Sequence, residues 1–162
     1  MPDHPCRKLS VVLQRQAVSS RWESHRWSVH GVLPDVGGER RPIVQSDSLL
    51  QMLYPGFDVF LYPDEAEGYF LNVSTEEPSV FVGLRTDEAT GDPYPYQTTL
   101  SYNEAARWMD GGERVERVPA WLELAAWMGQ FVELNYRPEP RKRRKPRSFA
   151  GKEGVLRPEG DQ

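Results

Sequence analysis

The side chains of this sequence that could take part in chemistry form few recognisable combinations, and the densest is a run of cations near the end of the chain. Residues 137–147 contain seven arginine or lysine residues and one acid, Glu139, so the run has a net charge of +6. The whole chain of 162 residues carries −4, which leaves −10 for the remaining residues. A block of like charge beside an acidic body is typical of a solvated segment that often binds a partner.

Residues that could act as metal ligands or catalytic groups are scattered. His4 and Cys6 lie close in sequence, but two ligands are fewer than a zinc site requires. His25 and His30 are five residues apart in an expected strand, so their side chains point to opposite faces. The sequence contains no Walker A loop, no Gly-x-Ser-x-Gly elbow and no His-Glu-x-x-His motif. We therefore expect a protein that is not an enzyme and that needs no cofactor or metal.

The cationic run follows a helix that is expected from about Ala120 to Tyr136. Helical spacing places Trp127 and Leu134, seven residues apart, on the same side as Glu123, away from the apolar face. Either these two side chains pack beneath the N-terminal segment or residues 45–54, or they form a contact patch, since tryptophan is enriched at interface hot spots. The opposite, core-facing side is expected to contain Trp121, Leu124, Ala125, Met128, Phe131 and Val132.

Short segments with period-two alternation are expected to form strands in the rest of the chain. Their connections are too short for crossover helices, so neighbouring strands should be antiparallel. A capping box from Ser101 to Glu104 predicts a short helix that stops at Gly111. The fold class predicted is α+β, with an antiparallel β-meander or small open barrel closed by a C-terminal α-helix. The expected strands are Leu9–Gln14, Arg21–Pro34, Gly56–Pro63, Tyr69–Ser74, Ser79–Arg85, Tyr96–Leu100 and Glu113–Val118.

The domain organisation expected is simple. Residues 1–8 are predicted to be a flexible N-terminus, residues 9–136 a single α+β domain, and residues 137–162 a basic, proline-rich, disordered tail. No stretch approaches the ~18 consecutive apolar residues of a membrane span, and the first residues lack the apolar region of a secretory signal. We therefore expect a cytoplasmic protein.

The cationic run could contact nucleic acid, a membrane surface or an acidic protein. The acidic body would repel a duplex, and the run lacks interleaved aromatic residues that would stack on bases. It also has no apolar face or lipidation signal for a membrane. An acidic protein surface is the partner that this pattern favours, with nucleic acid as the alternative. The partner-binding residues predicted are Trp127, Leu134, Arg141, Lys142, Arg143, Arg144, Lys145 and Arg147.

Three segments together resemble an uncharacterised bacterial family of proteins with a domain of unknown function. They are SSRWESHRWSVHGVLP with Trp22 and Trp27, YFLNVSTEEPSVFVGLR, and VPAWLELAAWMGQFVELNYRPEPRKRRKPRSF, and the likeness spans about Leu9 to Phe149. Genes of this family often lie beside those of molybdenum-dependent formate dehydrogenases. Where the family pattern ends its helix in His-Tyr or His-His, this chain has Asn135-Tyr136, so a role for that histidine does not carry over.

The resemblance implies a cellular context and no catalytic residues. That context is the assembly, cofactor loading or regulation of a large metalloenzyme. The sequence thus predicts a non-catalytic accessory protein whose partner is an acidic protein, such as a formate dehydrogenase or its assembly factor. Two alternatives stay open: a nucleic-acid-associated protein that binds through its basic tail, and a small enzyme or cofactor-binding protein with an unrecognised pocket.

Overall fold

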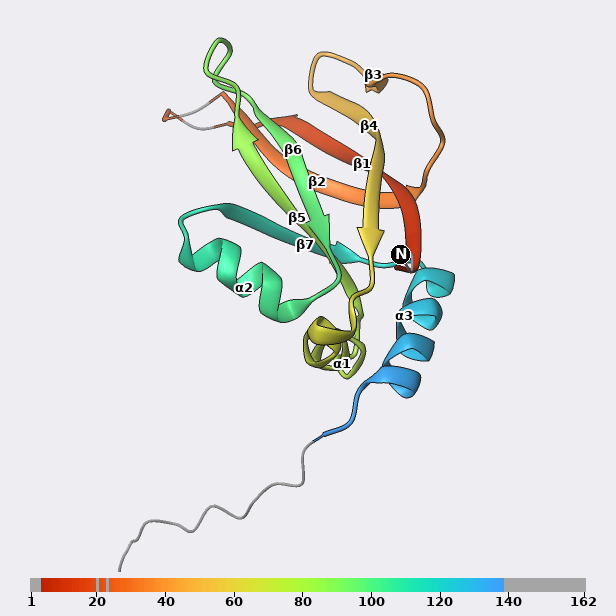
Figure 1. Cartoon of the computed structure of the whole chain (residues 1–162). Helices are drawn as coiled ribbons and strands as arrows, with labels where there is room; N and C mark the ends of the chain where they lie inside the picture. The colour runs from red at the N-terminus through yellow and green to blue at the C-terminus, as the bar shows by residue number, and fades with distance from the viewer. Residues whose placement is uncertain (1–3, 20, 23, 139–162) are drawn as a thin grey trace, which may run out of the picture.

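The computed structural model describes residues 4–19, 21–22 and 24–138 and shows an α+β fold (Figure 1). Within these residues the chain forms seven β-strands, three α-helices and one 3-10 turn. The strands are β1 (Cys6–Ala17), β2 (His25–Pro34), β3 (Arg41–Gln45), β4 (Leu49–Phe60), β5 (Ser79–Thr86), β6 (Pro93–Thr99) and β7 (Arg114–Pro119). The helices are α1 (Ala66–Val73), α2 (Tyr102–Asp110) and α3 (Leu122–Asn135), and the 3-10 turn, Pro63–Glu65, directly precedes α1.

The strands form two open antiparallel sheets. The larger sheet has the order β2-β1-β4-β3, and the smaller sheet has the order β6-β5-β7. Every paired strand is antiparallel to its neighbour, as the short connections predict. The α+β class, the antiparallel pairing and the C-terminal helix are therefore confirmed, and the strands of the described residues do not close into a barrel.

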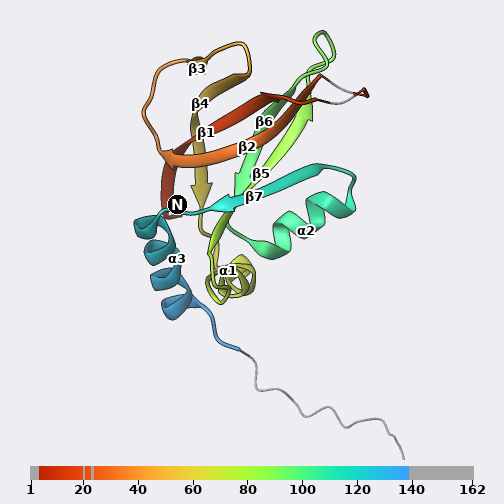
Figure 2. The same ribbon diagram turned by 180° about the vertical axis from the view of Figure 1, so that it is seen from behind.

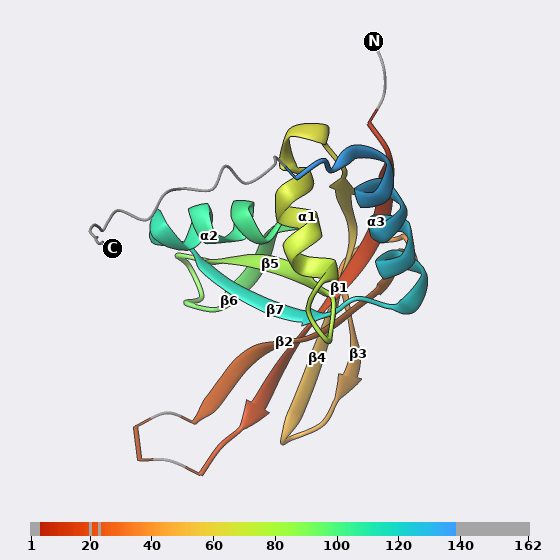
Figure 3. The same ribbon diagram turned by 90° about the horizontal axis from the view of Figure 1, so that it is seen from below.

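The two sheets meet where β2 lies beside β7 and β4 lies beside β6. Side chains bridge the first of these junctions. In β7, the Glu116 carboxylate accepts a hydrogen bond from the Val29 amide of β2 at 2.8 Å. The Arg114 guanidinium donates to the Trp27 carbonyl at 3.1 Å. Because the smaller sheet covers only part of the larger one, the ends of the β1–β2 and β3–β4 pairs extend past it (Figure 3).

The hydrophobic core lies between the sheets and is closed at one end by α1 and α3 (Figure 2). Helix α3 contributes four buried side chains, all from the face that the helical wheel predicts. Trp121 and Ala125, expected on the same face, are half-buried. The helix begins at Leu122, two residues later than expected, because Pro119 is still part of β7. The four buried side chains are Leu124, Met128, Phe131 and Val132.

The prediction of a strand over Tyr69–Ser74 is wrong, since most of this segment belongs to helix α1. The alternation of Tyr69, Leu71 and Val73 suggested a strand. In the helix, Tyr69 and Asn72 are buried three residues apart, whereas Leu71 is 39% exposed. A short apolar run fits either period, so the tertiary contacts decide its structure.

Tyr69 anchors α1 to the end of β4. Its hydroxyl accepts a hydrogen bond from the Tyr62 amide at 3.0 Å and donates one to the Phe60 carbonyl at 3.3 Å. Burial raises the pKa of the Tyr69 phenol far above its usual value of 10.0, so the group remains a donor at all physiological pH values.

The N-terminus of α2 is only half of the predicted capping box. The Ser101 hydroxyl accepts from the Glu104 amide at 3.0 Å, as expected. The Glu104 carboxylate does not reach back to the Ser101 amide. It accepts from the Thr99 hydroxyl at 2.6 Å, and the Ser101 amide donates to the oxygen of that same hydroxyl at 3.0 Å. Thr99 thus stands between the two residues of the box, which the local sequence pattern does not anticipate.

A carboxylate fixes a bulge in β4, where the pairing with β1 shifts between Leu9 and Val11. Asp35 Oδ1 accepts from the Gly56 amide at 2.8 Å and from the Ser10 hydroxyl at 3.0 Å. Gly56 has φ +88°, a conformation that favours glycine. The hydrogen bond from the Gly56 amide holds the pKa of the Asp35 carboxyl below its usual value of 3.8.

The free energy of unfolding is expected to depend on pH through Asp35. A carboxyl whose pKa is lowered by folding stabilises the folded state above its unfolded-state pKa, near 3.8, and this contribution is lost as the pH falls below it. In urea titrations from about pH 5 to about pH 2.5, wild-type stability should fall more steeply than that of Asp35→Asn. The Asp47→Asn variant, altered in the exposed β3–β4 turn, controls for the loss of one charge. Equal slopes for wild type and Asp35→Asn would contradict the role given to this carboxylate.

Candidate functional site

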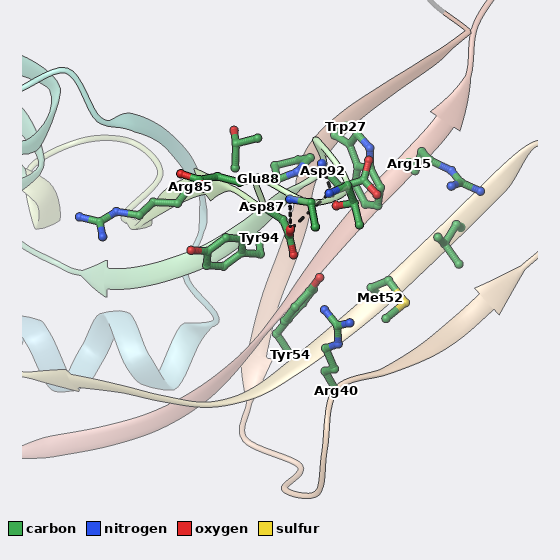
Figure 4. A pocket seen from close by; sticks show the side chains of 15 residues that line it. Arg15, Trp27, Arg40, Met52, Tyr54, Arg85, Asp87, Glu88, Asp92 and Tyr94 are labelled. Carbon is green, nitrogen blue, oxygen red and sulfur yellow. Dashed lines mark hydrogen bonds between the residues drawn. The ribbon is translucent and has the colours of Figure 1, made fainter.

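A groove of about 810 Å³ lies between the larger sheet and the β5–β6 hairpin (Figure 4). Its floor comes from the part of the larger sheet that the smaller sheet leaves uncovered. Its opposite wall is the hairpin loop, residues 87–92, with the strand ends that flank it. The side chains that matter most for its chemistry are Arg15, Trp27, Arg40, Leu50, Met52 and Tyr54 on the sheet side, and Asp87, Glu88 and Asp92 on the hairpin.

Strand alternation explains why charged and apolar side chains share this floor. In β1, Leu9, Val11 and Leu13 point into the core, and Arg15 is the next residue in the same phase. Arg15 pairs with Trp27 of β2 and with Leu50 of β4, in a row beyond the edge of the smaller sheet. The core face of the sheet therefore continues into the groove, where an arginine follows the apolar residues.

Two guanidinium groups on the sheet side are held by aromatic rings. The Arg15 guanidinium carbon lies 5.8 Å from the centre of the Trp27 ring, and that of Arg40 lies 5.8 Å from the centre of the Tyr54 ring. Among the residues that the structure describes, no carboxylate forms an ion pair with either guanidinium. Their charges and N–H donors therefore remain available to an anionic group.

Arg85 is a contrasting arginine at the same groove. Its guanidinium stacks on Tyr96 at 3.5 Å and donates to the Glu113 carboxylate at 3.1 Å. The hydrogen bond that Arg85 donates to the Glu113 carboxylate raises the pKa of Arg85 further above its usual value. In Figure 4 the Arg85 side chain points away from the other labelled residues. Its charge is thus already neutralised.

The hairpin presents acids across the groove from the arginines. One Asp87 carboxylate oxygen accepts from the backbone amides of Ala89 and Thr90, at 2.8 and 3.3 Å, and so shapes the loop. The Asp87 amide donates to the Asp92 carbonyl at 2.8 Å and closes the loop. Glu88 is exposed on the same loop. The sheet side of the groove is therefore cationic and aromatic, and the hairpin side is acidic.

The remaining chemical candidates do not assemble into a site. Within the described part of the chain, no group of three or more His, Cys, Asp or Glu side chains is placed to hold a metal ion. Burial and the neighbouring Asp58 carboxylate raise the pKa of the Cys6 thiol above its usual value of 9.0, which keeps it protonated and weakly nucleophilic. His25 and His30 are exposed on β2.

The structure places two of the predicted partner-binding residues on one side of α3. Trp127 is half-buried against the core, and the Arg7 guanidinium lies 4.5 Å from the centre of its ring. Leu134, one heptad later, is 75% exposed. We refer to the side that carries Trp127 and Leu134 as the outer α3 surface. The six remaining residues of the prediction lie outside the described residues: Arg141, Lys142, Arg143, Arg144, Lys145 and Arg147.

The sequence interpretation missed Arg7 and the whole groove. Arg7 reaches Trp127 only because β1 and α3 pack together, and no local pattern shows that contact. For the groove, one signal was present: Arg15 continues the alternation of Val11 and Leu13, so an arginine occupies the phase of the apolar face. A charged residue in the phase of the buried residues of a strand indicates where that face of the sheet is no longer covered by the core.

In the part of the chain that the structure describes, no helix is long and apolar enough to cross a membrane. Comparisons with curated proteins and with solved structures give no match. A family model described as "protein of unknown function (DUF3305)" matches residues 8–145, which is most of the chain. The resemblance to an uncharacterised domain family is thereby confirmed, and the chain belongs to the DUF3305 family.

Proposed function

We propose that this chain is a non-catalytic accessory protein that binds an acidic protein partner through the outer α3 surface and the cationic run that follows it. The observation that carries the proposal is Leu134, which is 75% exposed on the last turn of α3. It lies on the same side of the helix as Trp127, and residues 137–147, with their net charge of +6, begin three residues later.

The chemistry of this surface suits a protein interface. Covering an exposed leucine side chain contributes roughly 1.5–3 kcal/mol, which is a useful anchor for a small interface. The half-buried Trp127 is already ordered by the core and by Arg7, so a partner would not have to immobilise it. The adjacent cations would speed association with an acidic surface, an effect that salt weakens.

The partner that we propose is a molybdenum-dependent formate dehydrogenase or a factor that assembles it. The support is the family resemblance, since genes of that family often lie beside genes of such enzymes. In this setting the protein would assist assembly, cofactor loading or regulation of the enzyme. The Arg137 side chain, whose guanidinium donates to the carbonyls of Glu133 and Tyr136, would lie where the helix passes into the cationic run.

A capture experiment with matched leucine variants tests the proposal. Leu134→Ser in the tagged full-length protein should reduce recovery of the formate dehydrogenase, or of its assembly factor, about tenfold, as expected for an apolar anchor. Leu122→Ser is the control, because Leu122 is 84% exposed on the same helix but lies about 120° from Leu134 around its axis. Equal recovery with the two variants would contradict the assignment of the outer α3 surface.

A second arm tests the cationic run. Replacing the six cations from residue 141 to residue 147 by glutamine should weaken capture and abolish most of its salt dependence. If these substitutions leave capture unchanged, the run is not part of the docking site. Salt-sensitive retention of the wild type on a nucleic-acid column, lost in the glutamine variant, would support the nucleic-acid alternative instead.

A further inference from the structure

We propose that the groove between the larger sheet and the β5–β6 hairpin binds an extended peptide segment of alternating charge, with two acids on its sheet-facing side. This goes beyond the proposed function, because the groove shares no residue with the outer α3 surface. The peptide is identified by the arrangement of cations, apolar side chains and acids along the two walls.

The floor of the groove presents a cation, an apolar side chain and a second cation in the direction of β4, with Arg15 supplied by β1 and Arg40 by the residues before β3. Arg15 lies opposite Leu50, and Met52 follows Leu50 two residues later in β4. Two residues further on is Tyr54, and the Arg40 guanidinium lies over its ring. In Figure 4, Met52 lies between Arg15 at one end and Arg40 with Tyr54 at the other. A strand rises about 3.4 Å per residue, so Leu50 and Tyr54, which mark the two ends, are roughly 14 Å apart along β4. An extended peptide with acids at positions i and i+4 and an apolar residue at i+2 has the same spacing.

The acids on the hairpin determine whether a uniformly anionic strand or a peptide of alternating charge fits the groove. A nucleic-acid strand carries a charge at every residue, so its phosphates would also meet Glu88 and Asp92 on the hairpin. In an extended peptide, alternate side chains point to opposite sides. Acids at i and i+4 can therefore face Arg15 and Arg40 while basic residues at i+1 and i+3 face the hairpin acids. The charge of both walls is complementary to such a peptide and to no uniformly charged strand.

The two arginines of the groove are also free to bind a peptide carboxylate. Rings, and not carboxylates, hold the Arg15 and Arg40 guanidinium groups, so no internal ion pair has to break when a peptide carboxylate binds. A guanidinium that lies over a ring and has no carboxylate partner can bind a peptide carboxylate through two parallel hydrogen bonds. The volume of about 810 Å³ lies within the usual range of ligand sites.

Fluorescence anisotropy with two labelled peptides of one composition tests the proposal in the full-length protein. The ligand has the core Glu-Lys-Leu-Lys-Glu, and the control has the core Lys-Glu-Leu-Glu-Lys, so neither has a net charge. We expect the first peptide to bind at least tenfold more tightly than the second. Indistinguishable affinities, or no binding of the first peptide up to about 1 mM, would overturn the proposal, since about 1 mM is the range of the weakest specific contacts.

Three arginine variants locate the binding site. Arg40→Gln and Arg15→Gln should each weaken binding of the Glu-Lys-Leu-Lys-Glu peptide about tenfold, the usual effect of losing one charge-assisted hydrogen bond. Arg85→Gln should change it less than twofold, because its guanidinium is already paired with Glu113. Because Arg40 is exposed, Arg40→Gln should fold, and it therefore tests the binding site even if Arg15→Gln fails to fold. An equal loss in Arg85→Gln and Arg40→Gln would overturn the assignment.

A competition arm separates a peptide site from a small-anion site. Inorganic phosphate and guanosine monophosphate, each at about 1 mM, should not displace the peptide beyond what the same ionic strength of NaCl does. Displacement by either one beyond that level would overturn the peptide assignment in favour of a small anionic ligand. Because Leu134→Ser leaves the groove intact, it should bind the peptide like wild type, so failure of this inference and failure of the proposed function are distinguishable.

Discussion

Replacing Asn72 by alanine is expected to lower the free energy of unfolding by about 3–5 kcal/mol. Asn72 is completely buried in α1. Its amide nitrogen donates to the carbonyls of Ser79 and Leu100, both at 2.8 Å, and its oxygen accepts from the Ser79 amide at 2.9 Å. Met128 Sδ of α3 lies 3.6 Å from the same nitrogen.

The size of this effect follows from what alanine leaves behind. The variant removes three hydrogen bonds and leaves without these partners the buried backbone groups of Ser79 in β5 and of Leu100, directly after β6. Each unsatisfied buried group costs about 1–3 kcal/mol, and a small cavity adds to the cost. Native proteins have only about 5–15 kcal/mol of net stability, so the change is a large fraction of the total. The side chain ties the helical layer to the smaller sheet, and that layer positions α3.

Urea denaturation of three variants checks the prediction. Asn103→Ala is the matched control, because its side chain makes one exposed hydrogen bond of 3.3 Å to Glu67, and it should cost less than about 0.5 kcal/mol. Asn72→Asp keeps the size of the side chain but turns the donor into an acceptor that faces two carbonyls, so it should destabilise at least as much as alanine at neutral pH. A loss below about 1 kcal/mol in Asn72→Ala would show that these bonds contribute little.

Asn72 also shows why part of the fold could be predicted and part could not. Most strands around the core have clear period-two patterns, and the inner face of α3 has a clear helical period, so their types were predicted correctly. Strand β3 and the first half of β4, before Gly56, were not predicted. Helix α1 is short, and its sequence alternates by chance. Its structure depends on Tyr69 reaching the end of β4 and on Asn72 reaching Ser79 and Leu100. Such contacts between distant residues leave no local signal.

The two proposed binding surfaces could also be predicted only in part. Trp127 and Leu134 were predicted on one side of α3 from helical geometry alone, and the structure places both there. Their different exposure was not predictable, because Arg7 covers Trp127 from another element. The groove depends on how far the smaller sheet extends over the larger one. Only Arg15, in the phase of the apolar residues of β1, indicated where that cover ends.

Two helical glycines are expected to respond in opposite directions when changed to alanine. Alanine is normally preferred to glycine inside a helix by about 1 kcal/mol. Gly129 in α3 has nothing within 4 Å of the position of an added Cβ atom, so Gly129→Ala should stabilise the protein by about 0.5–1 kcal/mol. At Gly68 in α1, the added Cβ would lie 2.1 Å from the Ser101 hydroxyl oxygen and 3.2 Å from the Asn103 amide nitrogen. Gly68→Ala should therefore destabilise by about 1–3 kcal/mol.

The penalty at Gly68 is expected to come mainly from Ser101. Its hydroxyl caps α2 and donates to the Glu65 carboxylate at 2.6 Å, and the other oxygen of that carboxylate pairs with Arg107. A Cβ at position 68 would displace this hydroxyl and break both of its hydrogen bonds. A glycine N-cap is only a few tenths of a kcal/mol less stable than a serine N-cap. Ser101→Gly alone should therefore lower the free energy of unfolding only slightly, apart from the loss of the hydrogen bond to Glu65.

A double-mutant cycle separates the clash from the loss of the cap. If the clash with Ser101 dominates, Gly68→Ala should cost less in the Ser101→Gly background than in wild type, with a coupling of about 1 kcal/mol or more. Strict additivity would mean that the obstacle is the Asn103 backbone, which no side-chain change relieves. Both glycines lie outside the groove, and neither change touches Leu134, Arg15 or Arg40. Folded Gly68→Ala protein should thus bind the Glu-Lys-Leu-Lys-Glu peptide like wild type, which separates the scaffold from the surfaces it carries.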